Sequence, residues 1–337
     1  MFSAVKRDRG ASDDLDNVLS VLSFLRAAFG RAPWPAFDRP LLLDLHTHGL
    51  AAFAFAAAAR TGHALPPQTK DELRNSVMAN LAANEKRAPH LADVLCALAL
   101  TPSIAPLAFK GLDYAHRLYA DPSERPMGDH DLLVPDLRFG EALARLHAIG
   151  FRSALEQTGV AALAGHYAAQ LVRDGYQLDL HRAVRQPSRA AIDYSAIFAR
   201  STAGDVRGAP VRWLDARDRL LLHVYHQAAH EFSVPLVTFV DLELMLPADR
   251  ALVQRAKDFG IARPLAHALH LRDQIFGYAT RAPPPFAAVL PAIAEIARQE
   301  RPPRALQLVR KAVLFDSPRA LGRFARFSAG ALSPFRD

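Results

Sequence analysis

Residues 128–134 read Gly-Asp-His-Asp-Leu-Leu-Val and are followed by Pro135. The apolar run 132–134 predicts a short buried strand that ends at the proline. Side chains two residues apart on a strand point to the same side, so Asp129 and Asp131 should project together. Two carboxylates held that close repel each other unless a cation lies between them. Mg²⁺ is an oxygen-seeking ion that recruits substrate phosphates as ligands, so the pair indicates phosphate chemistry. The alternative for an isolated Asp-x-Asp pair is a solvated strand end.

The residues before this pair strengthen the phosphate interpretation. An apolar run at 103–109 is broken by Lys110-Gly111, after which Leu112, Ala115 and Tyr119 recur at helical spacing. The order is strand, glycine turn, helix, loop, and a strand with paired acids. A glycine in such a turn lets the backbone approach a phosphate closely near a helix N-terminus.

The residues after the pair supply a third acid. A helical pattern at 138–149 ends at Gly150, and two strand-like runs at 165–173 and 176–184 flank Asp174-Gly175, a strong hairpin signal. In the second run Asp179 and His181 share one face with Gln177, while Leu178 and Leu180 face the core. An acid on the polar face of a neighbouring strand suits a third metal carboxylate. His181 could orient a carboxylate or contact phosphate, and its alternative is a structural histidine.

The chain resembles a bacterial nucleotidyltransferase-like family in several places: Lys110-Gly111, Leu118-Tyr119, Asp121-Pro122, Arg125-Pro126 and residues 128–134. That family is similar to the polymerase-beta-type nucleotidyltransferases and is often found near lasso-peptide maturation genes. The resemblance implies a Mg²⁺-dependent enzyme that uses a nucleoside triphosphate, with ATP the first choice. It also implies that Asp179, which precedes Leu180-His181, is the third acid. The wider superfamily has Gly-Ser where this chain has Lys110-Gly111, a departure that the family shares.

These observations predict a site with distinct roles. Three acids are expected to hold Mg²⁺ and to carry the catalysis, and four further residues are expected to bind the nucleotide. Arg125 has an alternative role, in a salt bridge that steadies its loop. The predicted catalytic and metal-binding residues are Asp129, Asp131 and Asp179, and the predicted nucleotide-binding residues are Lys110, Gly111, Arg125 and His181.

Composition limits the class of protein. The 337 residues are 50% hydrophobic and 22% charged, which is typical of a globular chain with a sizeable core. A net charge of +7 suits an anionic ligand, and nucleic acid is not excluded as a partner. Cys96 is the single cysteine, consistent with a reducing compartment. Residues 1–16 lack the apolar core of a signal peptide, and no apolar run is long enough to span a bilayer. A cytoplasmic location is therefore expected.

The predicted fold class is α+β, with a small mixed sheet of nucleotidyltransferase type. We expect a helical N-terminal region at 1–100, the α/β core at 101–186 and a helical C-terminal domain at 187–337. Within these regions a long helix is predicted at 69–96, where residues 84–87 form a polar, solvated face. A helix is expected at 188–199 and a glycine-containing turn at Gly204 and Gly208.

Two groups of histidines offer competing metal sites. An apolar run ending in His46-x-His48 resembles the first-strand metal motif of amidohydrolases, although structural histidines at a helix start are the favoured interpretation. His223, His226 and His230 lie three and four residues apart on a predicted helix, but they lack the order of a His-Glu-x-x-His motif. Three classes of function therefore stand: a triphosphate-dependent transferase acting on a peptide, protein or small-molecule acceptor, a non-catalytic nucleotide-binding or partner-binding relative, and a His-x-His metal hydrolase.

Overall fold

A mixed β-sheet forms the centre of the fold. The computed structural model describes residues 11–153, 167–184, 190–246, 249–279, 283–299, 302–319 and 321–322. Within these ranges seven strands form one sheet in the order β3-β4-β5-β2-β1-β7-β6. Their bounds are β1 Leu107–Phe109, β2 His130–Leu133, β3 Arg152–Ser153, β4 Ala168–Arg173, β5 Tyr176–His181, β6 Thr202–Val206 and β7 Ala209–Trp213.

The strand directions are mixed. Strand β2 pairs antiparallel with β1 and parallel with β5, and β1 pairs parallel with β7. The predicted hairpin around Asp174-Gly175 is confirmed, because β4 and β5 pair antiparallel across it. Both turn residues have positive φ angles, 52° and 75°, as a two-residue hairpin turn requires.

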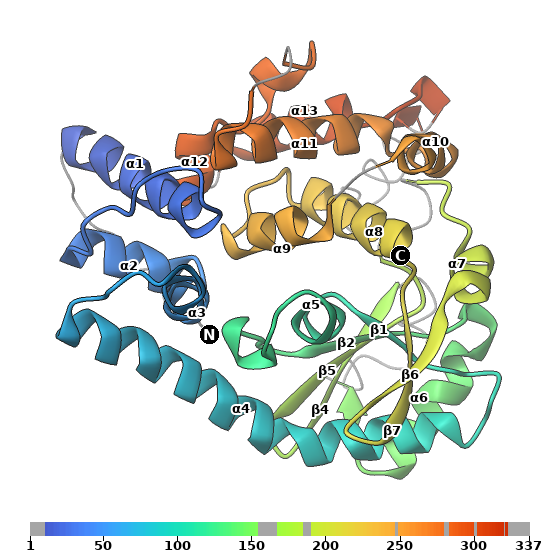
Figure 1. The fold of residues 1–337 in the computed structure, drawn as a ribbon. Coiled ribbons are helices and arrows are strands. Elements are labelled where there is room, and N and C mark those ends of the chain that lie inside the picture. The colour runs from blue at the N-terminus through green and yellow to red at the C-terminus, as the bar shows by residue number, and fades with distance from the viewer. Residues whose placement is uncertain are drawn as a thin grey trace.

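One face of the sheet is covered by α4, Pro67–Ala99, and α6, Phe139–Ala148 (Figure 1). Buried side chains of these helices pack on Ala108, Leu132 and Leu178 of the sheet. The predicted long helix is confirmed, and Pro89 lies inside it without ending it. The predicted 138–149 helix is also confirmed, and Gly150 follows it with a φ of 91°.

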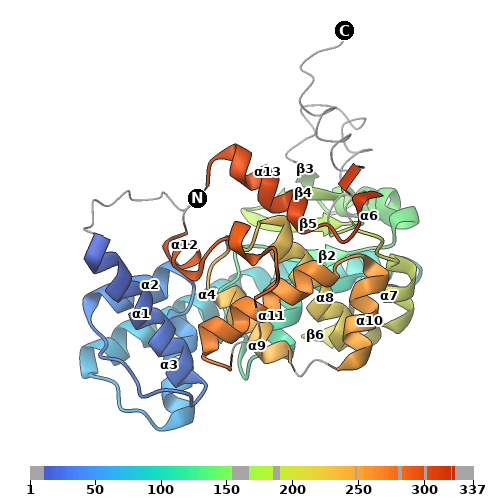
Figure 2. The same ribbon diagram turned by 90° about the horizontal axis from the view of Figure 1, so that it is seen from above.

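The other face of the sheet is covered by C-terminal helices. Figure 1 shows α8, Ala216–Ala229, and α9, Val237–Met245, on the side of the sheet opposite α4. The short helix α5, Gly111–Arg117, follows β1 directly. A second hydrophobic cluster joins Phe109 and Leu133 of this face to α8, α9 and the N-terminal helices. Figure 2 shows those N-terminal helices grouped to one side of the sheet: α1 Ala11–Ala28, α2 Arg39–Thr47 and α3 Ala51–Thr61.

The remaining helices lie beyond α8 and α9 or beside the sheet. They are α7 Tyr194–Arg200, α10 Arg250–Phe259, α11 Ala262–Phe276, α12 Ile293–Arg298 and α13 Arg304–Val313. Among the described residues no single helix is both long and apolar enough to cross a membrane. Helices α2 and α3 would together meet that length and composition, but they are bent by 114° where they join.

The fold class is confirmed at the level of a mixed α/β chain with one mixed sheet, but two local predictions are wrong. The glycine-containing turn expected at Gly204 and Gly208 is a pair of strands, β6 and β7, whose own turn holds Gly208. The sheet therefore extends beyond residue 186, where the helical C-terminal domain was predicted to have begun. The predicted helix at 188–199 begins in the described part of the chain only at Tyr194. The division into three regions stays a prediction.

Candidate active site

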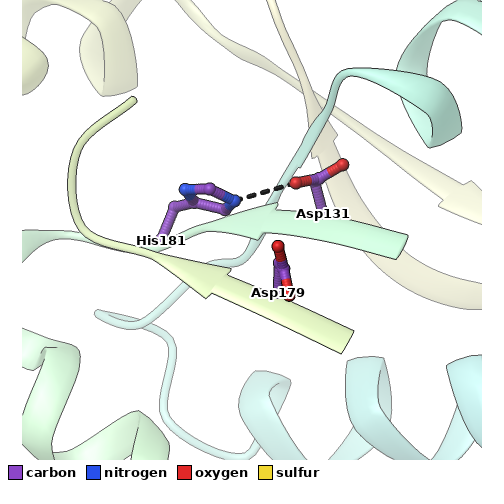
Figure 3. A group of neighbouring side chains, drawn as sticks. All are labelled: Asp131, Asp179 and His181. Atoms are coloured by element: carbon purple, nitrogen blue, oxygen red, sulfur yellow. Dashed lines mark hydrogen bonds and ion pairs between the residues drawn. The ribbon is translucent and has the colours of Figure 1, made fainter. Parts of the chain in front are cut away.

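Strands β2 and β5 place two carboxylates side by side. Asp131 pairs with Asp179 in the parallel register, and His181 lies two residues further along the same face of β5. One ligand atom from each of these three side chains lies within 4.8 Å of the others (Figure 3). Among the described residues they are the one group of three or more His, Cys, Asp or Glu side chains with metal-ligand spacing.

Asp131 is the most strongly held of the acids. Lys110 Nζ donates to its Oδ1 at 2.7 Å, and His181 Nε2 donates to the same oxygen at 2.8 Å. Burial alone would raise the pKa of Asp131, but the His181 hydrogen bond and the Lys110 charge outweigh burial and lower the pKa overall. Asp131 is therefore ionised at neutral pH, and Lys110 contacts an acid directly rather than standing apart from the acids.

Asp179 has the opposite electrostatics. Burial raises its pKa, the neighbouring Asp131 charge raises the pKa further, and His181 partly offsets both. A carboxylate whose pKa is raised by a like charge is one that a cation would stabilise in its ionised form. The predicted closeness of Asp179 to Asp131 is present in the structure.

Asp129 lies just outside this group. It precedes β2 rather than forming part of it, so the prediction that both acids lie on one strand is wrong. Its carboxylate is not among the three side chains with metal-ligand spacing. Burial and the Asp131 charge nevertheless raise the pKa of Asp129, so it belongs to the same electrostatic cluster.

The turn at Lys110-Gly111 is tightly constrained. Lys110 has φ 47° and ψ −127°, a backbone conformation that favours glycine, and it is the N-cap of α5. At Gly111 a Cβ atom would lie 3.1 Å from Arg125 Nη1 and 3.4 Å from Met127 Cγ. The strand–turn–helix order predicted here is confirmed, and the close approach of the Arg125 loop explains the glycine.

Arg125 adopts its alternative role. Its Nε and Nη2 donate to the two carboxylate oxygens of Asp241 on α9, each at 2.8 Å, and Tyr119 donates to the same carboxylate at 2.8 Å. The ion pair is buried, with 11% of the Arg125 side chain exposed and none of the Asp241 side chain. The salt bridge given as the alternative for Arg125 is therefore present, and phosphate binding by Arg125 stays a prediction.

His46-x-His48 does not form a metal motif. The run that would have been a strand is the helix α2, so the two imidazoles do not share a strand face. His46 is paired with Glu72 at 3.1 Å near the surface. His48 is buried, and its Nε2 donates to the Ala297 carbonyl at 2.8 Å. Burial lowers the pKa of His48 to about 4, so it is a neutral link between helices.

The histidines at 223, 226 and 230 make hydrogen bonds or ring contacts, and they are not in the group of described side chains with metal-ligand spacing. His223 Nε2 donates to the Thr238 carbonyl at 2.8 Å, and its Nδ1 lies 3.2 Å from the Tyr114 hydroxyl on α5. His226 and His230 contact each other through their rings, with centroids 4.9 Å apart. His226 lies close enough to the site that, after burial, the Lys110 charge lowers its pKa.

Sequence reasoning missed the partners that hold the site together. Asp241 was not among the predicted site residues, and its partner Arg125 lies 116 residues away. Asp113 of α5, which forms a buried ion pair with Arg219 of α8, was not predicted either. The signal in the sequence that could have predicted these ion pairs is an acid inside an apolar helical pattern. Such an acid is buried, and a buried acid needs a cation as its partner.

Comparison with known proteins identifies a family for this chain. No curated protein and no solved structure matches this chain. A family described as an uncharacterised nucleotidyltransferase matches residues 36–277, which include β1, β2, β5 and every residue of the candidate site. The match covers more than half of the 337 residues. The chain therefore belongs to this uncharacterised nucleotidyltransferase family.

Proposed function

We propose that the protein is a Mg²⁺-dependent transferase that moves a nucleotidyl or phosphoryl group from a nucleoside triphosphate, ATP first, to an acceptor that is a peptide, a protein or a small molecule. The observation that carries this proposal is the pairing of Asp131 with Asp179 across β2 and β5, beside His181. Membership of the nucleotidyltransferase family supports the same reaction class.

The donor atoms fit a divalent cation. Two neighbouring carboxylates, one of them with a raised pKa, supply the oxygen ligands and the negative charge that Mg²⁺ prefers. Asp131 and Asp179 would hold the ion, with Asp129 at its margin. Bound there, Mg²⁺ supplies charge neutralisation of the triphosphate and polarisation of the phosphorus–oxygen bonds.

The remaining residues of the site act on the substrate or on the acids. Lys110 lies 2.7 Å from Asp131 and would exchange part of that contact for a phosphate oxygen. Gly111 opens α5, and its backbone N–H would donate to the same phosphates. His181 keeps Asp131 oriented by its hydrogen bond, so we assign it as a positioning residue.

The transfer step balances with one proton acceptor. In nucleotidyl transfer the acceptor oxygen bonds to the α-phosphorus, the α–β phosphoanhydride bond breaks and pyrophosphate leaves. In phosphoryl transfer the γ-phosphorus is attacked and a nucleoside diphosphate leaves. In either case the acceptor hydroxyl loses its proton, and Asp179, which lies beside Asp131 at the reacting centre, would take that proton as the general base.

Labelled triphosphates test the proposal. The protein is incubated with Mg²⁺, a cell extract as the source of acceptors, and each nucleoside triphosphate labelled at the α- or the γ-phosphate. Transfer of the α label indicates nucleotidyl transfer, and transfer of the γ label indicates phosphoryl transfer. Asp131→Asn and Asp179→Asn should each lower transfer at least about 100-fold, since each removes charge from the reacting centre.

A matched control comes from the same hairpin. Asp174 is exposed, lies in the β4–β5 turn, and has a φ of 52° that asparagine tolerates. Asp174→Asn should therefore transfer label at the wild-type rate. Equal labelling by wild type, Asp131→Asn and Asp179→Asn would refute the assignment of the acids.

A non-catalytic nucleotide-binding role is the second candidate, and one contact favours it. Lys110 already supplies a positive charge 2.7 Å from Asp131, where a catalytic ion would otherwise be needed. In that case ATP would bind equally well with and without Mg²⁺, and no label would be transferred. Magnesium-dependent ATP binding measured by calorimetry excludes this candidate.

A further inference from the structure

A pocket lies on the face of the sheet opposite the acids. Residues alternate along β2, so Asp131 points to one face and His130 to the other. His130 lines a pocket of about 130 Å³ between α4, α5, the loop at 121–127 and the β6–β7 turn. Figure 1 shows α4 passing along this side of the sheet. The pocket is thus separate from the proposed catalytic face.

Its walls are apolar. Leu91 of α4, Leu112 of α5 and Met127 contribute to the lining. Met127 is fixed from behind, because Arg87 Nη1 donates to its carbonyl oxygen at 2.8 Å. Of residues 84–87, predicted to form a solvated face, Glu85 and Lys86 are exposed, whereas Asn84 lines the pocket and Arg87 gives this support.

Six of the lining residues are polar or charged, and three of these have an amide or ring atom without a hydrogen-bond partner among the described residues. These three are Asn84, His116 and His130. The amide of Asn84 and the imidazole of His116 form no hydrogen bond with any described residue. His130 is 97% buried and uses Nδ1 with the Tyr176 hydroxyl at 2.8 Å, which leaves Nε2 without a partner in the described chain. An apolar pocket with a few convergent polar groups is the usual form of a small-molecule site.

The converging groups are neutral at pH 7. Burial, followed by the Arg87 charge, lowers the pKa of His130 to about 4, and burial also lowers the pKa of His116. The charged groups at the rim are already paired. Arg207 Nη1 donates to Glu85 at 2.8 Å, and Asp121 accepts from the backbone N–H of Ser123 at 2.8 Å.

We propose that this pocket binds a nucleobase, presented as a nucleoside. A nucleobase is a neutral flat ring with apolar faces, and its edge carries both donors and acceptors. A carboxamide such as that of Asn84 offers one donor and one acceptor, the pairing by which asparagine reads an adenine edge. Imidazole and apolar walls suit the faces of the ring. The proposal does not depend on the transferase activity, because the ligand needs neither phosphate nor metal ion.

Calorimetry with the full chain tests it, using adenosine, guanosine, cytidine and uridine without divalent ions. At least one nucleoside should bind at a 1:1 ratio with a Kd below about 1 mM. Asn84→Leu should weaken binding at least about tenfold, since it removes a hydrogen-bonding edge. Ala92→Phe, which fills the pocket from α4, should abolish binding.

The controls separate this site from the acids. Asn75→Leu makes the same exchange at an exposed position nine residues earlier on α4 and should bind as wild type does. Thermal unfolding of each variant confirms that it folds. Asp131→Asn should keep full nucleoside binding even where transfer fails. No binding by any nucleoside, binding unchanged in both Asn84→Leu and Ala92→Phe, or binding lost in Asp131→Asn would each overturn the proposal.

Discussion

At the scale of single residues, Lys110 combines an ion-pairing side chain with a strained backbone. Its side chain neutralises Asp131, while its backbone adopts a φ of 47° that a side chain disfavours. Residues held in such conformations cost about 1–3 kcal/mol and cluster at functional sites. Glycine would remove the strain but also the charge. The turn nevertheless carries a lysine, which fits a site where the cation is needed.

The strain at Lys110 predicts that a glycine variant at this position is more stable than an alanine variant, which reverses the usual order. Both Lys110→Ala and Lys110→Gly lose the ion pair, but glycine also relieves the backbone, so Lys110→Gly should be more stable by about 1 kcal/mol. Lys86 lies in the middle of α4, where Lys86→Gly should instead be less stable than Lys86→Ala by about 1 kcal/mol. Urea unfolding measures all four variants. Lys110→Ala equal to or more stable than Lys110→Gly would show that the turn is unstrained.

His267 makes a second prediction at this scale. It is buried on α11, and neither ring nitrogen has a hydrogen-bond partner among the described residues. His267→Leu should therefore raise the free energy of unfolding by about 1 kcal/mol, since it removes an unsatisfied polar group. His223→Leu is the matched control. It breaks the hydrogen bond to Thr238 and should destabilise the protein. Thermal unfolding at pH 7.5 measures both variants. A His267→Leu variant that is less stable than wild type would contradict this prediction.

Whether the role of a residue could be predicted depends on how far away in the sequence its contacting residues lie. The Asp174-Gly175 turn is local, so the sequence identified the hairpin and with it the face of β5 that carries Asp179. The approach of Asp179 to Asp131 needs a parallel pairing across 48 residues, and it was predicted from the polar face of the strand together with the family resemblance. The partner of Arg125 lies on a distant helix, and no local signal could choose between Asp241 and a phosphate.

At the scale of elements, buried ion pairs fix the parts that carry the site. Arg125 joins the loop before β2 to α9, and Asp113 joins α5 to Arg219 of α8. The loop that contains Arg125 and the helix α5, which begins at the Lys110-Gly111 turn, are therefore both held to the C-terminal helices. Such pairs are weak sources of net stability, but breaking one leaves a buried charge.

Removing one partner of the Arg125 pair should be costly. Arg125→Met should lower the free energy of unfolding by about 3–5 kcal/mol, because it leaves Asp241 buried and uncompensated. The double variant Arg125→Met/Asp241→Leu should recover part of that loss. Urea unfolding of the single and double variants measures the coupling. Full stability of Arg125→Met, together with a raised KM for the triphosphate, would restore the phosphate-binding role.

Elements with strong periodicity were predicted, as were the short strands β1 and β2, but strands β6 and β7 were not. The 33 residues of α4 carry enough repeats to mark a helix despite Pro89. Strands β6 and β7 have only five residues each, and they contain Gly204 and Pro210, which are typical of turns. At Gly204 the Trp213 indole lies where a side chain would be, so the glycine serves cross-strand packing. The glycine that makes β6 hard to predict from the sequence is therefore also required for the packing of β6 against β7.

At the scale of the whole molecule, buried neutral histidines predict acid sensitivity. Burial lowers the pKa values of His48, His130 and His223 to about 4 from the ordinary 6.5. Below pH 6.5 the unfolded chain binds protons that the folded state cannot, so stability falls as pH falls towards 4. Each histidine should cost about 2 kcal/mol at pH 5 relative to pH 7.5. The raised pKa values of Asp129 and Asp179 oppose this loss.

Urea unfolding at pH 7.5, 6 and 5 measures the slope. We expect the unfolding midpoint to move to lower urea at each step, with most of the loss below pH 6.5. His130→Phe keeps a ring of similar size without a titratable group and should flatten the curve. A midpoint that stays constant from pH 7.5 to pH 5 would mean that these histidines titrate normally and are reached by solvent.

One ion shared by two strands is the centre of the proposed mechanism. The most direct measurement is a crystal structure of the protein with Mn²⁺ and a non-hydrolysable ATP analogue, in which anomalous scattering locates the metal. We predict an anomalous peak in coordination contact with carboxylate oxygens of both Asp131 and Asp179, with the triphosphate bound to the same ion. A bound nucleotide with no peak at these acids, or a peak that contacts only one of them, would contradict the shared site.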